Sequence, residues 1–261
     1  MIVFSLVTFQ VSADEASTDL TEGAHFETNN GMSPDAVTDD NYVSYWYTNK
    51  AEGKYLEISS TQPIKHLYVA YAFKPSEVII QTSQDGSEWT DFTREYADEY
   101  YHVTYTFDTT CYYIRVKGAE GSKDKFGIVE AKIFTEGSLP DYAQQWEPTH
   151  EQADMLIFAA HTDDEAVFFS GIIPYYAGEL DKKVTTVYMT ASDPTRRSEA
   201  LNYQWTMHET NLPLFAYFED IGGDGYAYVR SRWGNEKTLN YMVSVIRQLK
   251  PDVIVSHDIH N

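Results

Sequence analysis

The chain has 261 residues, of which 43% are hydrophobic, so it is long enough for two domains with packed cores. Its formal net charge of −21 argues against DNA or RNA as a partner, because phosphate binding needs clustered Lys and Arg. The single cysteine, Cys111, excludes an internal disulfide and zinc sites built from several cysteines. Its strand-like surroundings predict a small buried side chain.

Residues 1–13 have the composition of the end of a signal peptide. An apolar run leads to Val11-Ser12-Ala13, a small-residue cleavage pattern, although the usual basic start is missing. The alternative is a buried N-terminal strand. A signal peptide predicts a secreted or cell-surface protein, and no other segment is long and apolar enough to span a membrane.

The pattern from residue 20 to 136 is strand-like. Short runs of β-branched and aromatic residues alternate with turn sequences such as 84–87 and 118–122. Many short strands at this spacing favour an all-β sandwich. Residues 137–152, which contain Gly, Ser and two Pro, predict a linker.

Strands alternate with helices in the last part of the chain, residues 153–261. A continuous apolar run predicts a buried strand at 155–160, and two further strands are predicted at 183–191 and 252–256. Periodic segments predict helices at 165–180, 196–211 and 238–249, the last of them ended by Pro251. This alternation predicts an α/β domain with a parallel sheet.

The segment Ala160-His161-Thr162-Asp163-Asp164-Glu165 follows a predicted buried strand and opens a helix. In open α/β sheets the ligand crevice lies at the carboxyl ends of the strands, so these side chains are expected in a site. A neutral imidazole and a carboxylate three residues apart can both reach one divalent metal. A second carboxylate beside them can act as a base on water whose pKa the metal lowers to roughly 7.

Two alternatives accompany this metal-site hypothesis. Asp163 and Asp164 could simply cap the following helix, where carboxylates are favoured. Another polar cluster, Ser256-His257-Asp258-Ile259-His260-Asn261, follows the last predicted strand, and His257 or His260 could either approach the same crevice or lie in a surface loop.

The 160–165 segment resembles the A-H-P-D-D-E signature of the PIG-L/LmbE-like deacetylases, with Thr162 in place of the proline. The resemblance covers roughly residues 153–261. Weaker matches follow in the expected order: the strand ending at Thr190, Arg196 with Glu199, Phe218-Glu219-Asp220, and the stretch from Pro251 to Asp258.

This resemblance implies a Rossmann-like sheet and zinc-dependent removal of an acetyl group from an N-acetylglucosamine unit. His161 and Asp164 match the family's metal ligands, Asp163 its general base, and Arg196 a substrate-contacting residue. The family's third ligand comes from a G-x-Y-G-H-x-x-H segment that this sequence does not contain, so the third ligand is expected beyond Asn261, with His260 as the weaker candidate. We therefore interpret the sequence as truncated, which leaves open whether the chain as given is active.

Residues 20–135 resemble the discoidin, or coagulation factor 5/8 C-type, sandwiches and related carbohydrate-binding modules. The most telling piece is Ser83-Gln84-Asp85-Gly86-Ser87-Glu88-Trp89. Many relatives hold a structural calcium, whose ligands would here be Asp39 and Glu130; the alternative for Asp39 is a turn residue. Trp46 and Trp89 are expected in the core rather than as sugar platforms.

The sequence thus favours a secreted metal-dependent deacetylase that acts on N-acetylglucosamine-containing glycans and is held on them by the sandwich. One alternative is a non-catalytic carbohydrate-binding or adhesion protein with an incomplete α/β domain. Another keeps the fold and hydrolyses a non-sugar amide.

Overall fold

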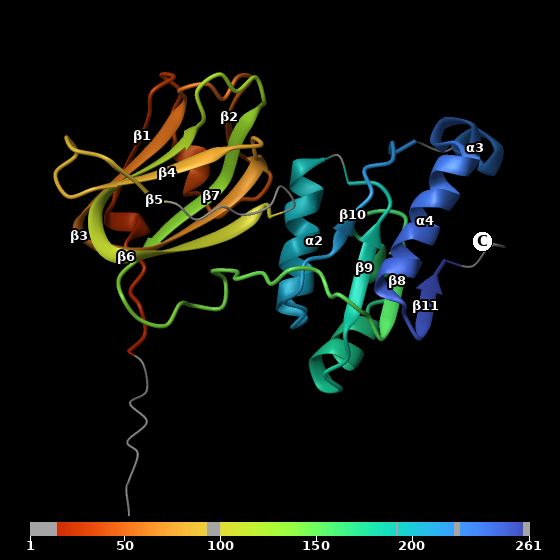
Figure 1. Cartoon of the computed structure of the whole chain (residues 1–261). Coiled ribbons are helices and arrows are strands. Elements are labelled where there is room, and N and C mark those ends of the chain that lie inside the picture. The colour runs from red at the N-terminus through yellow and green to blue at the C-terminus, as the bar shows by residue number, and fades with distance from the viewer. Residues whose placement is uncertain (1–14, 93–99, 192, 222–224, 258–261) are drawn as a thin grey trace, which may run out of the picture.

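The computed structural model describes residues 15–92, 100–191, 193–221 and 225–257; the predicted signal peptide at 1–13 and His260 lie outside these ranges. Within them the chain forms an antiparallel β-sandwich followed by a four-stranded parallel sheet with helices, as the sequence predicts (Figure 1). No helix among the described residues is both long and apolar enough to cross a membrane.

The sandwich is one hydrogen-bonded path of strands in the order β2-β7-β3-β6-β4-β5, with β1 paired to β3. Two short 3-10 helices, η1 (Thr21–Gly23) and η2 (Asp35–Val37), lie in its first part. Its strands are β1 (His25–Thr28), β2 (Trp46–Thr48), β3 (Tyr55–Phe73), β4 (Val78–Ser83), β5 (Thr90–Phe92), β6 (His102–Gly118) and β7 (Phe126–Phe134).

The long strands β3 and β6 take part in both layers of the sandwich. The register of this pair shifts between Ser59 and Ile64, next to Pro63, which has no N–H to donate. Before the shift β3 pairs with β1, and after it with β7. The sheet therefore folds over on itself and encloses an apolar core that includes Trp46, Leu56, Ile58, Leu67, Ile114 and Phe126. Cys111 is also buried there, as predicted.

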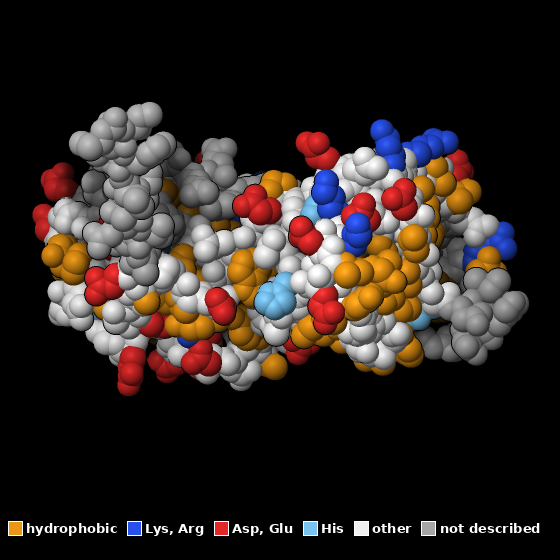
Figure 2. Space-filling view, turned by 90° about the horizontal axis from the view of Figure 1, so that it is seen from below, with side chains coloured by type: hydrophobic (Ala, Val, Ile, Leu, Met, Phe, Trp, Pro, Cys, Tyr) orange, Lys and Arg blue, Asp and Glu red, His pale blue; other side chains and the backbone are white. Residues whose placement is uncertain are grey.

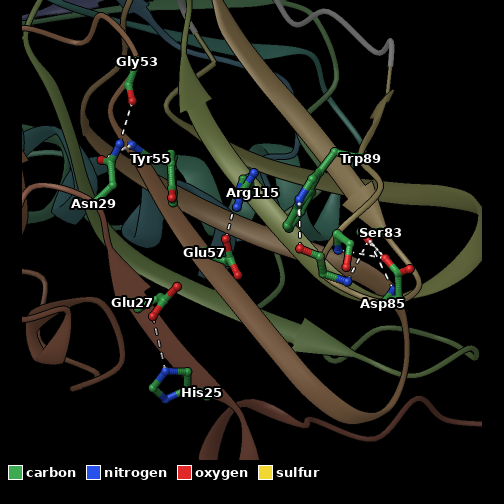
Figure 3. A network of polar contacts seen from close by, with 12 residues as sticks. His25, Glu27, Asn29, Gly53, Tyr55, Glu57, Ser83, Asp85, Trp89 and Arg115 are labelled. Carbon is green, nitrogen blue, oxygen red and sulfur yellow. Dashed lines mark hydrogen bonds and ion pairs between the residues drawn. The ribbon is translucent and has the colours of Figure 1, made fainter.

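The Ser83–Trp89 motif forms a tight turn (Figure 3). Asp85 Oδ1 accepts the backbone N–H groups of Ser87 and Glu88 at 2.8 and 3.1 Å, and Gly86 has the positive φ of 76° that the turn requires. Trp89 is only half-buried, so the prediction that it belongs to the core was wrong. The cause is Arg115, whose guanidinium stacks 3.8 Å from the Trp89 ring centroid and brings charge to this surface.

The α/β part contains four parallel strands in the order β10-β9-β8-β11. They are β8 (Met155–Ala159), β9 (Val184–Tyr188), β10 (Leu214–Phe215) and β11 (Val253–Ser256). Between them lie α1 (Asp164–Val167), the π-helix η3 (Pro174–Glu179), α2 (Pro194–Thr206), α3 (Tyr226–Trp233) and α4 (Asn235–Leu249). Every residue of β8 and β9 is buried, and β8 is apolar throughout, as expected of a strand covered on both faces.

The single helix predicted over 165–180 is not present. Two short helices, α1 and η3, replace it, and the chain between them contains Ser170-Gly171. Gly disfavours a helix interior and Pro174 cannot donate a backbone hydrogen bond, so the segment is broken where the sequence pattern alone looked continuous. Helix α3 was not predicted at all.

The strand order places a topological switch between β8 and β11. The chain steps from β8 to β9 and then β10 on one side, and returns with β11 on the other side of β8. In such sheets the ligand crevice opens at the carboxyl ends of the strands at this switch. The segments after Ala159 and after Ser256 both begin there.

Helix α2 packs against the sandwich and joins the two parts of the molecule. The buried Arg197 donates Nη2 to Ala72 O of β3 and Nη1 to Ala191 O, each at 3.0 Å. Its guanidinium also lies 4.1 Å from the ring centroid of Tyr101. A second link joins buried His102 Nε2 of β6 to Ser198 Oγ at 3.2 Å.

Candidate metal centre

The loop after β8 brings three predicted site residues into one cluster. His161, Asp163 and Asp164 each offer a ligand atom, and these atoms all lie within 4.8 Å of one another. Thr162 between them is buried, with 5% of its surface exposed. The loop is thus anchored by the residue that replaces the proline, and the three polar side chains remain grouped.

Asp164 lies at the centre of the cluster. It is 4% exposed, and its Oδ2 accepts the backbone N–H of His161 at 2.8 Å. Asp163 occupies the N-cap position of α1, yet no side chain caps that helix. The alternative reading of the two aspartates as mere helix caps is therefore not supported by the geometry.

His257 reaches the same carboxylate from β11. Its Nε2 lies 2.9 Å from Asp164 Oδ2, and the rings of Phe168 and Phe169 lie 5.1 and 5.0 Å from its imidazole. Of the two histidines proposed for this end of the sheet, the structure brings His257 to the crevice. The two aromatic rings restrict the imidazole, so it is placed to orient Asp164.

Arg196 lies on the first turn of α2 and contacts Asp163. Its Nη2 is 2.6 Å from Asp163 Oδ2, and 55% of the Asp163 side chain is exposed. Asp193 caps this helix, because its side chain accepts the Arg196 N–H at 3.1 Å. Asp163 is thus open to solvent, where it could reach a water molecule, and its position is restrained by the ion pair.

Two further carboxyl groups at this site were not assigned from the sequence. Asp220 Oδ1 lies 3.5 Å from His161 Nε2. Asp220 was part of a family match, and its position just beyond β10, at a strand's carboxyl end, was the available signal. Glu165 is buried with Oε2 unpaired, and burial raises its pKa from 4.5 to about 7.

The donor set suits a borderline divalent metal. One imidazole nitrogen and carboxylate oxygens of a buried and an exposed aspartate are the ligand types zinc takes in catalytic sites. The contacts of Asp164 Oδ2 with the His161 backbone N–H and with His257 Nε2 fix the orientation of that carboxylate. The residues present therefore fit a metal ion.

The predicted calcium residues of the sandwich occupy different environments. Glu130 is fully buried, and among the described residues neither of its carboxylate oxygens has a hydrogen-bond partner. Lys132 Nζ lies 3.6 Å away, and burial raises the pKa of Glu130 to about 7. Asp39 is exposed, and its oxygens accept from the N–H of Asn41 and the hydroxyl of Ser44 at 3.0 and 2.6 Å. Asp39 thus makes a turn here, whereas Glu130 is a buried acid with Lys132 as its ion-pair partner.

Comparison with known proteins finds a family model that matches the α/β part. Residues 156–261 match the family model PIG-L, described as GlcNAc-PI de-N-acetylase. No curated protein matches the chain.

Solved carbohydrate-binding modules resemble the sandwich part. A chitosan-binding module of a chitosanase/glucanase from Paenibacillus sp. IK-5 is 18% identical, with 45% of this chain and 99% of that chain covered and a TM-score of 0.39. A family 32 module from C. perfringens NanJ, solved with galactose, is 12% identical, with 46% and 99% covered and the same TM-score. Such distant likeness assigns no ligand to this chain.

Proposed function

We propose that this chain, whose residues 156–261 form a PIG-L domain, is a zinc-dependent deacetylase that removes the acetyl group from N-acetylglucosamine units of glycans. The observation that carries the proposal is the cluster of His161, Asp163 and Asp164 at the switch point of the parallel sheet. An imidazole, a buried carboxylate and an exposed carboxylate within 4.8 Å supply two ligands and a base at one place.

The reaction follows from the placement of these groups. A zinc ion held by His161 and Asp164 would polarise the acetamide carbonyl and acidify a water molecule. Asp163 accepts the proton of that water as its oxygen bonds to the carbonyl carbon. The C–N bond then breaks, the proton passes to the departing nitrogen, and acetate and a free amine leave. The ion pair of Arg196 with Asp163 supports a role for Arg196 beside the base.

The direct test is acetate release from N-acetylglucosamine oligomers by the full-length protein with zinc. We expect release, and we expect Asp163→Asn to retain metal and lose roughly 10²- to 10⁴-fold in rate, because the base is removed while His161 and Asp164 remain. Glu236→Gln, at an exposed acidic residue on α4, is the matched control and should keep full activity.

Three results separate the alternatives. Full activity in Asp163→Asn would refute the base assignment. Metal binding without acetate release would favour hydrolysis of a different, non-sugar amide. Neither metal nor acetate, with glycan binding retained, would favour the non-catalytic binding protein.

We further propose that the sandwich binds glycan and holds a calcium ion through Glu130. Support for the calcium comes from the two orphaned oxygens of buried Glu130, since calcium prefers oxygen ligands. Secretion belongs to the same proposal, and N-terminal sequencing of the mature protein tests it: a first residue at or near Asp14 is expected.

A further inference from the structure

A groove of about 610 Å³ lies where the sandwich, the connecting segment and α2 meet. Its aromatic side chains come from all three parts: Tyr42 from the sandwich, Tyr142 from the connecting segment and Trp205 from α2. A volume of this size is within the range of small-ligand sites in proteins. The groove exists only because the two parts of the molecule pack together.

The three aromatic rings are held in place by their own contacts. Trp205 Nε1 donates to Asp141 O at 2.5 Å, and the Tyr142 hydroxyl donates to Asp19 Oδ2 at 2.8 Å. Tyr42 stacks on buried His102, with 5.9 Å between ring centroids and 18° between planes. Rings fixed in advance lose little conformational entropy when a ligand covers them.

The rest of the lining is polar and carries little charge. Gln144, Asn202 and His208 are among these residues, and Asp141 is the one charged group in the lining, which contains no Lys or Arg. Among the described residues the imidazole of His208 makes no hydrogen bond or ion pair. A lining without a cation disfavours phosphate or carboxylate ligands, and its many polar groups disfavour a purely apolar one.

Neutral sugar rings match such a surface. Their C–H faces pack on aromatic rings, and their hydroxyl groups bond to amides and imidazoles. In the view from below, hydrophobic, acidic and histidine side chains lie beside one another near the middle of the molecule, and most of the Lys and Arg side chains on this face lie on the α/β part (Figure 2).

We propose that this junction groove binds a stretch of neutral oligosaccharide, as a second site on the glycan that the catalytic crevice acts on. The proposal rests on the proposed function for the identity of the glycan. Arg196 and Trp205 are nine residues apart on α2, so the groove and the crevice are separated by ~14 Å along that helix. One glycan chain held at the groove would keep its other units near the crevice.

The test is calorimetric titration of N-acetylglucosamine oligomers of one to six units into the full-length Asp163→Asn protein, which does not consume them. Binding should strengthen with oligomer length. Adding Tyr142→Ala or His208→Gly should weaken binding of the hexamer at least 10-fold and that of the monosaccharide much less. His208 has a φ of 66°, so glycine removes the imidazole without straining the backbone.

Tyr228→Ala is the matched control, because Tyr228 is similarly exposed and lies on α3, outside the groove. Unchanged hexamer affinity in both groove variants would overturn the proposal, and so would the absence of hexamer binding to the unsubstituted groove. Acetate release distinguishes the groove proposal from the proposed function. If acetate is released but the groove variants bind the hexamer as tightly as before, the deacetylase is supported and the groove is not. If binding depends on the groove but no acetate is released, the groove is supported and the deacetylase is not.

Discussion

At the scale of single residues, the candidate site is organised around one buried carboxylate. Asp164 Oδ2 accepts the backbone N–H of His161, and the same oxygen lies within hydrogen-bond distance of His257 Nε2. The same Oδ2 lies 3.7 Å from His161 Nδ1, so this oxygen faces the cluster. The exposed Asp163, one residue away, is held by Arg196 instead. Two adjacent aspartates thus have different environments and different expected roles.

We expect His257→Ala to lower zinc affinity roughly 10- to 100-fold, because removing a hydrogen-bond partner from a ligating carboxylate loosens its orientation. The measurement is competitive zinc titration against a chromophoric chelator. His25→Ala is the control, since the His25 side chain is 73% exposed on the sandwich. Equal affinity in both variants would contradict the orienting role.

Glu130 makes stability depend on pH. Burial raises its pKa from 4.5 to about 7, so the folded state binds its proton more tightly than the unfolded state does. The resulting stabilisation is complete below pH 4.5, falls as the pH rises to about 7, and is absent above that. The loss is on the order of 3 kcal/mol.

The check is urea unfolding at pH 4.5, 6 and 8 without calcium. Glu130→Gln should remove the part of the fall in unfolding free energy with rising pH that Glu130 contributes. Glu88→Gln, at an exposed position, should leave that pH dependence in place. Adding calcium at pH 8 should stabilise the unsubstituted protein and not Glu130→Gln. A calcium response that survives in Glu130→Gln would argue against this carboxylate as a ligand.

At the scale of elements, the start of α2 positions Arg196. The Asp193 side chain accepts the Arg196 N–H, and Pro194 supplies the fixed φ that suits a first helical turn. The helix start fixes the backbone from which Arg196 reaches Asp163. Loss of the cap should therefore affect both stability and the site.

Asp193→Ala should destabilise the protein by about 1 kcal/mol and reduce kcat/KM, whereas Asp193→Ser, which keeps a capping oxygen, should restore most of both. Urea unfolding and acetate release measure the two effects. If Asp193→Ala and Asp193→Ser behave alike, the cap does not position Arg196.

At the scale of the whole molecule, buried polar contacts join the sandwich to the α/β part. Arg197 bonds to backbone carbonyls on both sides of the junction, and His102 meets Ser198 across it. Such buried links predict that the two parts unfold together, because separating them leaves polar groups unpaired. The groove formed by Tyr42, Tyr142 and Trp205 depends on the same junction.

We expect a single calorimetric unfolding transition for the protein and two separate transitions for Arg197→Leu, which leaves the carbonyls of Ala72 and Ala191 without this donor. Arg247→Leu, on the exposed side of α4, should keep one transition. A single transition in Arg197→Leu, at an unchanged temperature, would show that this arginine does not couple the two parts.

The sequence by itself determined the order of the two architectures and the motif at the end of β8, because strand periodicity, apolar runs and turn residues are local properties. It also placed His161, Asp163 and Asp164 together, since they are neighbours in the chain. The prediction from sequence was wrong where local signals conflicted. The single helix expected over 165–180 is replaced by two short helices, because Ser170, Gly171 and Pro174 interrupt it.

Only the tertiary structure decided which distant residues meet. His257 approaches Asp164 because β11 pairs with β8, and Asp220 approaches His161 because β10 ends at the same edge of the sheet. The junction groove exists because the two parts are packed against each other. Contacts between distant segments depend on strand order and packing, which no local pattern encodes.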